Sequence, residues 1–471
     1  MNKLKMYSKI TLFLAGLSLL AFLFMSTLIF MNGEKILISV SFSHNVLYLL
    51  ILIDRDQTLR LEKTPRGEQE MSMITDRIAL TKALLSKPQI LKAKPSVNRF
   101  LLQYLRKFRA VKVGNNLILH SHLPPVNSKA YTRFIKEHLL SKIAGPSHAQ
   151  IAVTNACPQN CEYCYNKDRK GKVIDTETIK TVIRDLKELG VFWLGFTGGE
   201  PLLQKDIVKI TESVGDDCAV KLFTTGCTLT EQLARDLKNA GLFSVSVSLD
   251  HWKAEEHDKV RNYPGAFQTA LKAIEVFKDI GGVHVGVSAV LSKDMIEKNQ
   301  VEEFLDFLIG LEVHEAWLSE CKPSIAEFWT DDLVITEQER LNLVELQDRY
   351  NKEGRITVNY LAHFEGREHF GCNAGHKMVY VDPFGEVGPC VFIPISFGNV
   401  KENSIKTIFK EMREYFPSED TCFINKNYGI IRKYFSGTAP LGISDSVKVV
   451  EEACFGPRAR FFAMHYRGKN S

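Results

Sequence analysis

Acidic residues are absent from one long part of the sequence: between Arg77 and Lys136 there is no aspartate or glutamate. Thirteen of the 60 Lys and Arg lie in this stretch, so the rest of the chain is acidic, with 47 basic against 55 acidic residues. A basic stretch of this kind usually contacts phosphate groups, on nucleic acid or on an anionic membrane surface. No nucleic-acid-binding motif accompanies it, so we expect membrane lipids, and no nucleic acid, as its partner.

Cysteine is too scarce for a disulfide scaffold, at ten residues in a chain of 471. The close spacing of several of these cysteines indicates metal or redox chemistry in a reducing compartment instead. With 45% hydrophobic and 24% charged residues, the composition excludes a largely disordered chain. The length exceeds what one small core needs and predicts two or three domains.

Charge is missing from a run of 22 residues near the N-terminus, Ile10 to Met31 (ITLFLAGLSLLAFLFMSTLIFM). A helix of this length can span a bilayer, and no cleavage site typical of a signal peptide is evident. Ile36 to Ile53 is a weaker candidate, either a second span or an apolar pair of strands. Lysines before the first run favour a cytoplasmic N-terminus. We expect residues 1–60 to form a membrane anchor of one or two transmembrane spans. The reducing compartment that the cysteines indicate requires the catalytic domain on the cytoplasmic side, which favours two spans or a single span of inverted orientation.

Basic and apolar side chains alternate at helical spacing from Arg99 to Val111 (RFLLQYLRKFRAV). The apolar residues that share one face of this expected helix are Phe100, Leu101, Tyr104, Leu105 and Phe108. A basic amphipathic helix beside a membrane span is typical of membrane-surface binding. The alternative is an ordinary surface helix that packs on its own domain. We assign residues 61–145 to a basic membrane-proximal segment.

From residue 149 onward, short apolar runs alternate with helical patterns. The six runs expected to form strands are 149–155, 191–196, 219–225, 243–250, 283–291 and 313–319. The stretches with helical periodicity between them are 176–189, 203–214, 230–240, 266–280 and 301–311. This alternation predicts parallel βαβ units and an α/β fold class, with a partial (β/α)6 TIM-like barrel over residues 146–345. In such barrels the chemistry gathers at the carboxyl ends of the strands.

Three cysteines lie in the loop after the first expected strand, in the stretch CPQNCEYCYNKD: Cys157, Cys161 and Cys164. Three thiolates can hold three corners of a four-iron cluster and leave the fourth iron without a protein ligand. Zinc would normally recruit a fourth Cys or His nearby, and this loop contains none. The alternatives are a zinc site that lacks one ligand and three unrelated thiols.

Polar residues follow two later strands of the expected barrel. Gly198 and Gly199 precede Glu200 in FTGGEP; the glycines would let a ligand approach the backbone, and the carboxylate would bind an ammonium group. Ser248 and Asp250 end the fourth strand on the same side and could hold ribose hydroxyls. Ordinary turn chemistry is the alternative explanation for the second pair.

Taken together, these residues resemble the radical S-adenosylmethionine (radical SAM) superfamily over about residues 149–320. The spacing C-x3-C-x2-C matches its cluster motif, with Tyr163 at the aromatic position. TGGEP resembles the strand that binds the methionine amino group, SVSLD (246–250) resembles the ribose-contacting strand, and HDKVRNYPGAF (257–267) is similar to a stretch in the branch with C-terminal extensions. The departures are FTTGC, which lacks the usual asparagine, and His251, which replaces a glycine.

The resemblance implies an enzyme whose cofactors are a [4Fe-4S] cluster and S-adenosyl-L-methionine. The catalytic and cluster-binding residues would be Cys157, Cys161 and Cys164, and the cofactor-binding residues Tyr163, Gly198, Gly199, Glu200, Ser248 and Asp250. One electron from a donor such as flavodoxin or ferredoxin would break the S–C5′ bond of the cofactor. The resulting 5′-deoxyadenosyl radical would then abstract a hydrogen atom from the substrate.

Two cysteines of the C-terminal third, Cys372 and Cys390, flank an expected hairpin with Gly385 at its turn. This pattern resembles the opening of the SPASM auxiliary-cluster domain, to which we assign residues 346–471. The later cysteine run of that family is absent, so one auxiliary [4Fe-4S] cluster is the most that the resemblance implies. We assign Cys372, Cys390 and Cys454 as its ligands, with Cys321 and Cys422 also available. A degenerate domain without a cluster is the alternative.

Three functions remain open. The first is a membrane-anchored radical SAM enzyme that modifies a membrane-associated substrate such as a lipid or isoprenoid, which the expected anchor and basic segment favour. The second is a SPASM enzyme that modifies a ribosomally made peptide, although residues 77–136 lack the pattern of a leader-binding winged-helix domain. The third is a binding module with a vestigial cluster, against which the intact cysteine triad argues. The sequence leaves the substrate unknown.

Overall fold

The computed structural model describes residues 25–31, 34–40 and 87–465, apart from 106, 109 and 362–365. The chain forms two compact units, residues 1–65 and residues 66–471. The acid-free basic stretch therefore belongs to the same unit as the cysteine motifs.

In the first unit, β1 (Met25–Met31) and β2 (Glu34–Val40) form an antiparallel pair of strands. The membrane span expected over residues 10–31 is not supported, because its last seven residues form β1, and the rest of it lies outside the described residues. The weaker candidate, 36–53, contributes to β2 and otherwise lies outside them as well. Nowhere in the part of the chain that the structure describes is there a helix long and apolar enough to cross a bilayer.

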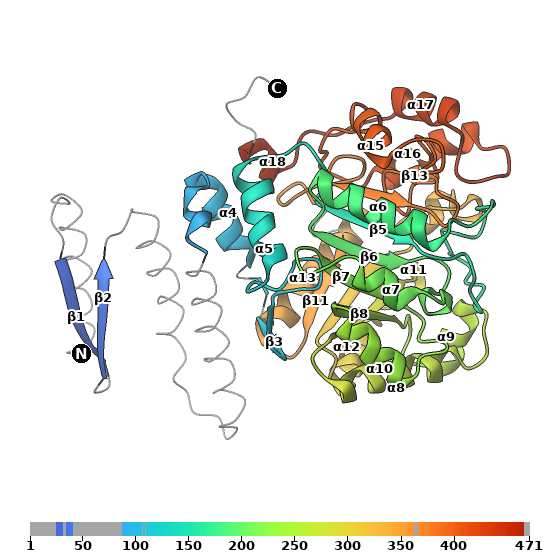
Figure 1. The fold of residues 1–471 in the computed structure, drawn as a ribbon. Coiled ribbons are helices and arrows are strands. Elements are labelled where there is room, and N and C mark those ends of the chain that lie inside the picture. Colours follow the sequence, from blue (N-terminus) through green and yellow to red (C-terminus); the bar gives the residue numbers. More distant parts are fainter. Residues whose placement is uncertain are drawn as a thin grey trace. The chain divides into compact units, whose positions relative to one another are not determined.

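The second unit is built on a curved nine-stranded sheet in the order β11-β10-β9-β8-β7-β6-β5-β12-β13 (Figure 1). The parallel strands of the partial barrel are β5 (His148–Ala152), β6 (Trp193–Thr197), β7 (Ala219–Thr224), β8 (Leu242–Ser248), β9 (His284–Leu291), β10 (Glu315–Glu320) and β11 (Thr357–Tyr360). The six predicted strands are all present in the predicted order, and β11 adds one more.

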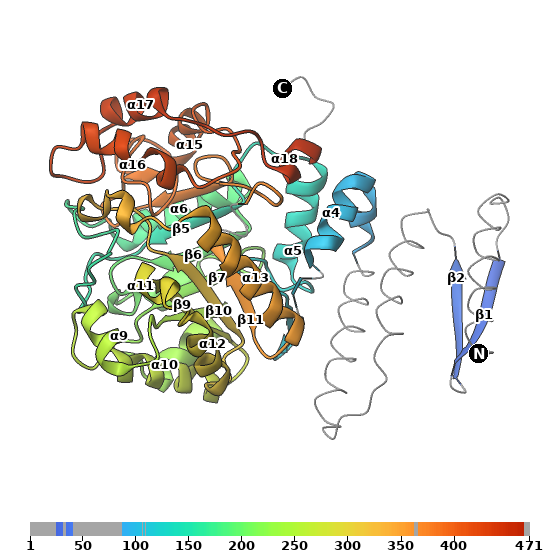
Figure 2. The same cartoon turned by 180° about the vertical axis from the view of Figure 1, so that it is seen from behind.

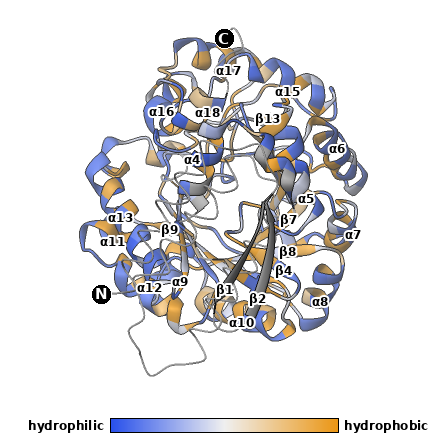
Figure 3. Cartoon of the chain, turned by 90° about the vertical axis from the view of Figure 1, so that its left-hand side faces the viewer, coloured by the Kyte–Doolittle hydropathy of each residue, from blue (hydrophilic) through white to orange (hydrophobic). Residues whose placement is uncertain are grey.

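Helices cover the outer face of this sheet (Figure 3). They are α6 (Thr176–Leu189), α7 (Ile207–Glu212), α8 (Glu231–Asn239), α9 (Ala254–Arg261), α10 (Ala266–Ile280), α11 (Lys293–Glu297), α12 (Val301–Gly310) and α13 (Glu337–Glu353). In α6, the Asp175 side chain accepts the N–H of Thr178, and Gly190 ends the helix at φ 110°. Buried Ile179, Val182, Ile183 and Leu186 recur at helical spacing and face the sheet.

The C-terminal part extends the sheet beyond β5. Strand β12 (Met378–Val381) pairs parallel with β5, and β13 (Val387–Gly388) pairs antiparallel with β12. The helices that follow are α15 (Ile405–Arg413), α16 (Phe423–Tyr434), α17 (Ile443–Glu452) and α18 (Arg460–His465). A buried ion pair of 3.2 Å between Arg169, in the segment after the three cysteines, and Asp382, at the β12–β13 turn, joins the barrel to this part.

The basic segment packs inside the second unit. Its elements are η3 (Pro88–Lys92), α4 (Pro95–Leu105), β3 (Val111–Val113), β4 (Asn116–Ile118), α5 (Lys129–Arg133) and the π-helix η4 (Phe134–Leu140). Both views place α4 and α5 beside α18 from the far end of the chain (Figures 1 and 2). The Phe100 ring lies 5.6 Å from that of Phe370 and 5.4 Å from that of Phe461. The prediction that this apolar face lies on a membrane is therefore wrong, because its described side chains are buried within the protein.

Residues 119–123, which we call the plug loop, enter the amino end of the barrel. The Ser121 N–H donates to Glu315 Oε2 at 2.9 Å, and its Oγ accepts from Lys221 Nζ at 2.5 Å. Trp193 Nε1 donates to the Ser121 carbonyl at 2.8 Å. Trp193 and Glu315 are the first residues of their strands, so the basic segment closes the end of the barrel opposite to the cysteine loop.

Candidate active site

The three cysteines of the predicted cluster motif lie together in the loop after β5. Cys157 is exposed, Cys161 is buried and Cys164 is half-buried. Burial raises the pKa of Cys161 to about 11, so this thiol must lose its proton when it binds iron. Among the described residues, no three His, Cys, Asp or Glu side chains gather closely enough to hold a single metal ion. Three thiols without oxygen or nitrogen ligands match the donor set of an iron–sulfur cluster, which is wider than one ion.

Asp250 follows the end of β8, as predicted, but both of its carboxylate oxygens already have partners in the protein. Oδ2 accepts from the Tyr163 hydroxyl at 2.6 Å and from Arg261 Nε at 2.7 Å, and Oδ1 accepts from the Val290 N–H at 2.9 Å. Burial acts to raise the pKa of Asp250, but the charges of Arg261 and His257 and these hydrogen bonds outweigh it and lower the pKa. Ribose binding by Asp250 stays a prediction, beside a structural role that the sequence analysis missed.

Glu200 is completely buried at the end of β6. Its Oε1 accepts from Thr224 Oγ1 at 2.6 Å and from the Leu202 N–H at 2.9 Å. Its Oε2 accepts from the N–H and the hydroxyl of Thr225, at 2.6 and 2.5 Å. Burial nevertheless raises the pKa of Glu200. The two threonines of FTTGC thus fix this carboxylate, and its contact with the methionine ammonium stays a prediction.

Gly198 and Gly199 lie directly against the backbone of the cysteine loop. A Cβ at Gly198 would lie 2.4 Å from the Thr154 carbonyl oxygen, and a Cβ at Gly199 would lie 2.2 Å from that of Ala156. The Gly199 N–H donates to the Thr154 carbonyl at 2.8 Å. The backbone that approaches these glycines is the protein's own, so they bring the cysteine loop and β6 together. That they also let the cofactor approach stays a prediction.

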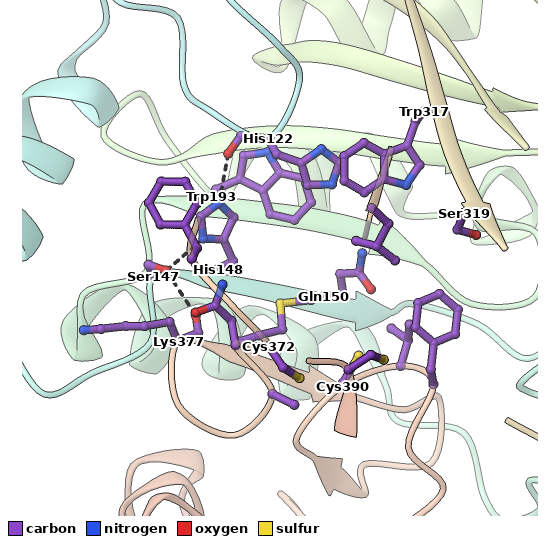
Figure 4. Close-up of a pocket in the computed structure, with 18 of the residues that line it drawn as sticks. His122, Ser147, His148, Gln150, Trp193, Trp317, Ser319, Cys372, Lys377 and Cys390 are labelled. Atoms are coloured by element: carbon purple, nitrogen blue, oxygen red, sulfur yellow. Dashed lines mark hydrogen bonds between the residues drawn. The ribbon is translucent and has the colours of Figure 1, made fainter. Parts of the chain in front are cut away.

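A cavity of about 400 Å³ connects the predicted site residues of both domains. Tyr163, Ser248 and Arg261 line it from the cofactor side, while Cys372 and Cys390 line it from the C-terminal part. Figure 4 shows the inner end, where the His122 imidazole of the plug loop stacks between the indoles of Trp193 and Trp317, with ring centroids 4.8 and 3.6 Å apart. The sequence analysis missed these three residues, because no sequence motif marks them and they meet only in the fold.

The cysteines assigned to the auxiliary cluster are only partly brought together. Four of the five candidates line the cavity: Cys321, Cys372, Cys390 and Cys422. Cys454 is exposed and is not among the described lining residues; its backbone N–H donates to Asn427 Oδ1 at 2.9 Å. The assignment of Cys454 as a ligand stays a prediction. The cavity lining suits Cys422 better as a partner of Cys372 and Cys390.

Comparisons with known proteins bear on these domains. Residues 151–308 match the Radical SAM superfamily, and residues 372–427 match SPASM, an iron–sulfur cluster-binding domain. An AdoMet-dependent heme synthase of Methanosarcina barkeri is 24% identical over 66% of this chain and 90% of its own length. A PqqA peptide cyclase of Rhizobium meliloti is 25% identical over 59% of this chain and 76% of its own length. Mycofactocin maturase MftC of Mycolicibacterium smegmatis is 27% identical, with coverage of 56% and 71%.

The solved structures show a similar fold. The crystal structure of Streptococcus suis SuiB bound to S-adenosylmethionine superposes with a TM-score of 0.51 at 16% identity, covering 65% of this chain and 80% of SuiB. At that identity the likeness shows the fold alone. The cofactors of this chain are a [4Fe-4S] cluster and S-adenosylmethionine, and its SPASM domain implies an auxiliary cluster. The chain thus carries a radical SAM domain followed by a SPASM domain, and it is a radical S-adenosylmethionine enzyme.

Proposed function

We propose that the protein is a peptide-modifying radical SAM enzyme, a maturase whose substrate binds in the cavity between the barrel and the SPASM domain. The relatives named a PqqA peptide cyclase and a mycofactocin maturase support this class of substrate. When bound and reduced, the cofactors supply a 5′-deoxyadenosyl radical that abstracts hydrogen. The chain's own residues enclose and orient the substrate next to it.

The observation that carries the proposal is a set of buried polar atoms around the cavity. His122 Nδ1, Ser324 Oγ and Asn373 Oδ1 have no hydrogen-bond partner among the described residues, and all three residues line the cavity. A buried polar atom without a partner costs about 1–3 kcal/mol, so such an atom usually finds one in an ordered water, an ion or a ligand. A peptide backbone alternates N–H donors with carbonyl acceptors and can satisfy all three, whereas a hydrocarbon chain cannot.

The test uses a strain that lacks the protein and therefore accumulates its unmodified substrate. Reconstituted enzyme with dithionite and S-adenosylmethionine is mixed anaerobically with the small-peptide fraction of this strain, and 5′-deoxyadenosine is measured. We expect the peptide fraction to stimulate 5′-deoxyadenosine formation, and protease treatment of that fraction to remove the stimulation. Stimulation that survives proteolysis, or that comes from the lipid extract instead, would contradict the proposal.

A matched pair of variants tests the binding site. Asn373→Leu removes one of the unpartnered atoms and should raise the peptide concentration needed for half-maximal stimulation about tenfold, because a hydrogen bond worth about 1.4 kcal/mol is lost. Ser418→Ala is the control, since Ser418 Oγ is also buried without a partner but does not line the cavity. Equal effects of the two substitutions would show that the cavity does not bind the peptide.

A membrane-derived apolar substrate is the second candidate, favoured by the uncharged run of residues 10–31 and by the aromatic walls of the cavity. On this proposal the protein sediments with membranes, its catalytic domain faces the cytoplasm, and deletion of residues 1–65 releases it. Fractionation of cells that express the full-length chain or the chain without residues 1–65 tests this second candidate. A full-length chain that remains in the supernatant would remove this second candidate.

A further inference from the structure

Arg261, the last residue of α9, contacts one of the cluster cysteines. Its Nη1 lies 3.8 Å from the Cys161 sulfur, within the range of a hydrogen bond to sulfur. Both side chains are buried, so water screens the contact little. Arg261 lies in the stretch HDKVRNYPGAF, and its contact with Cys161 could not be predicted from that stretch.

The guanidinium is held in place from the other side. Arg261 Nε and Asp250 Oδ2 form an ion pair of 2.7 Å, and the Tyr163 hydroxyl donates to the same oxygen at 2.6 Å. The Arg261 guanidinium also lies over the Tyr163 ring, 5.7 Å from its centroid. Asp250, Arg261 and the Cys161 sulfur therefore form a row in which the arginine is the middle member.

The backbone of α9 supports the same arrangement. The Asn160 N–H donates to the Arg261 carbonyl at 3.2 Å, and the Glu162 N–H donates to the Val260 carbonyl at 3.4 Å. The residues on both sides of Cys161 are thus bonded to the end of the helix that carries Arg261. The ion pair with Asp250 and these backbone hydrogen bonds together fix the distance between the guanidinium and the Cys161 sulfur.

We propose that Arg261 is a positioning residue that raises the reduction potential of the cluster bound by Cys157, Cys161 and Cys164, through its hydrogen bond to the Cys161 sulfur. Hydrogen bonds to cluster sulfurs and nearby charges set the potential of iron–sulfur clusters. On reduction the cluster gains one electron, and no bond of the protein is made or broken. The positive guanidinium stabilises the added negative charge, and the proposal is independent of the substrate.

Removal of the arginine should lower the reduction potential of the cluster for two reasons. The hydrogen bond to the sulfur is lost, and the buried negative charge of Asp250 is no longer balanced near the cluster. In Arg261→Gln we expect the ratio of reduced to oxidised cluster at a fixed potential to fall about tenfold, which is about 59 mV for a one-electron couple. Arg261→Lys keeps the positive charge and should recover part of this shift.

The measurement is an anaerobic redox titration of full-length, iron-loaded protein, followed by electron paramagnetic resonance. The signal of the auxiliary cluster is obtained from a variant in which Cys157, Cys161 and Cys164 are all replaced by alanine, and is subtracted. The matched control is Arg133→Gln, which removes a partly buried, ion-paired arginine that makes no hydrogen bond to a cluster cysteine. Its potential should equal that of the wild type.

An unchanged potential in Arg261→Gln would overturn the proposal, and so would a shift that Arg133→Gln reproduces. A purely structural role would lower iron content and thermal stability but leave the potential of the loaded fraction unchanged, which the same titration detects. A shift seen only after S-adenosylmethionine is added would assign Arg261 to the cofactor rather than to the sulfur. A shift that is present without S-adenosylmethionine and is partly restored in Arg261→Lys supports the proposal.

Discussion

Individual residues of the site are held by more partners than their sequence motifs suggested. Lys377 of the SPASM domain is an example, because nothing in the sequence around it predicted its partners. Its buried Nζ donates to the carbonyls of Ile143 and Gly145, at 2.8 and 3.0 Å. Burial, assisted by the charge of Arg413, lowers the pKa of Lys377 to about 7. This lysine therefore ties the SPASM domain to the segment before β5 while it is easily deprotonated.

The pKa of Lys377 predicts how stability depends on pH. Between the folded-state pKa of about 7 and the ordinary value of 10.5, the unfolded chain binds a proton that the folded chain does not. The free energy of unfolding should therefore rise with pH across this window, at up to about 1.4 kcal/mol per pH unit. Anaerobic urea unfolding at several pH values measures this slope in the wild type and in Lys377→Met. Equal slopes in the two proteins would show that another group is responsible.

Glu200 and Asp250 illustrate what the sequence can and cannot show at this scale. Their places at the ends of β6 and β8 follow from the alternation of strands and helices, which the sequence displays. Their partners do not: Asp250 is paired with Arg261, 11 positions away, and Glu200 with Thr224 and Thr225 of the neighbouring strand end. These pairs form only when separate elements pack, and propensity or periodicity carries no record of them.

At the scale of elements, the cysteine loop and the β12–β13 hairpin are joined by buried charges. The side chains of Arg169 and Asp382 are 2% and 0% exposed, and the guanidinium lies 5.2 Å from the centroid of the Tyr380 ring. Asp382 Oδ1 also accepts the N–H groups of Phe384 and Glu386 and so shapes the turn. The loop of the radical SAM domain and the turn of the SPASM domain therefore depend on each other.

Removal of one partner of this ion pair should lower the free energy of unfolding. Arg169→Met leaves the Asp382 carboxylate buried without its positive partner, and we expect a loss of about 3–5 kcal/mol in the free energy of unfolding. Arg169→Met combined with Asp382→Asn should be more stable than Arg169→Met alone, because the asparagine keeps an oxygen for the turn but carries no charge. Chemical denaturation of the three proteins checks this; additive losses in the double variant would refute the coupling.

Whether residues from the basic segment complete the barrel can be tested by truncation. Deletion of residues 1–65 removes one compact unit and should leave the melting temperature of the remainder nearly unchanged. Deletion of residues 1–126 also removes the plug loop and exposes Trp193 and the hydrogen-bonding groups of Lys221 and Glu315. We expect this second protein to bind a hydrophobic dye and to melt at a lower temperature. Similar melting of the two truncated proteins would argue against the plug.

At the scale of the whole molecule, the sequence predicted the barrel, the cysteine loop and the SPASM hairpin, because each has a local pattern. It misplaced the apolar face of α4, since a helix that is basic on one side and apolar on the other looks the same whether a membrane or a protein covers it. Phe370 and Phe461, which cover Phe100, lie more than 200 positions away in the chain. Only the tertiary structure distinguishes the two cases.

The whole enzyme should depend on its cluster. Cys157→Ala removes one of three protein ligands, and we expect cleavage of S-adenosylmethionine to 5′-deoxyadenosine by dithionite-reduced protein to fall below detection. Chromatography of anaerobic reactions measures the product, with Cys218→Ala as the control, because Cys218 is buried beside a core strand and lines no part of the cavity. Full turnover by Cys157→Ala would contradict the assignment of the cluster.

The plug loop has a consequence for the path of substrate and product. Because residues 119–123 close the amino end of the barrel, we expect the substrate to enter and the product to leave at the carboxyl ends of the strands. At the amino end, residues 119–123 of the chain itself separate the cavity from the surrounding solvent.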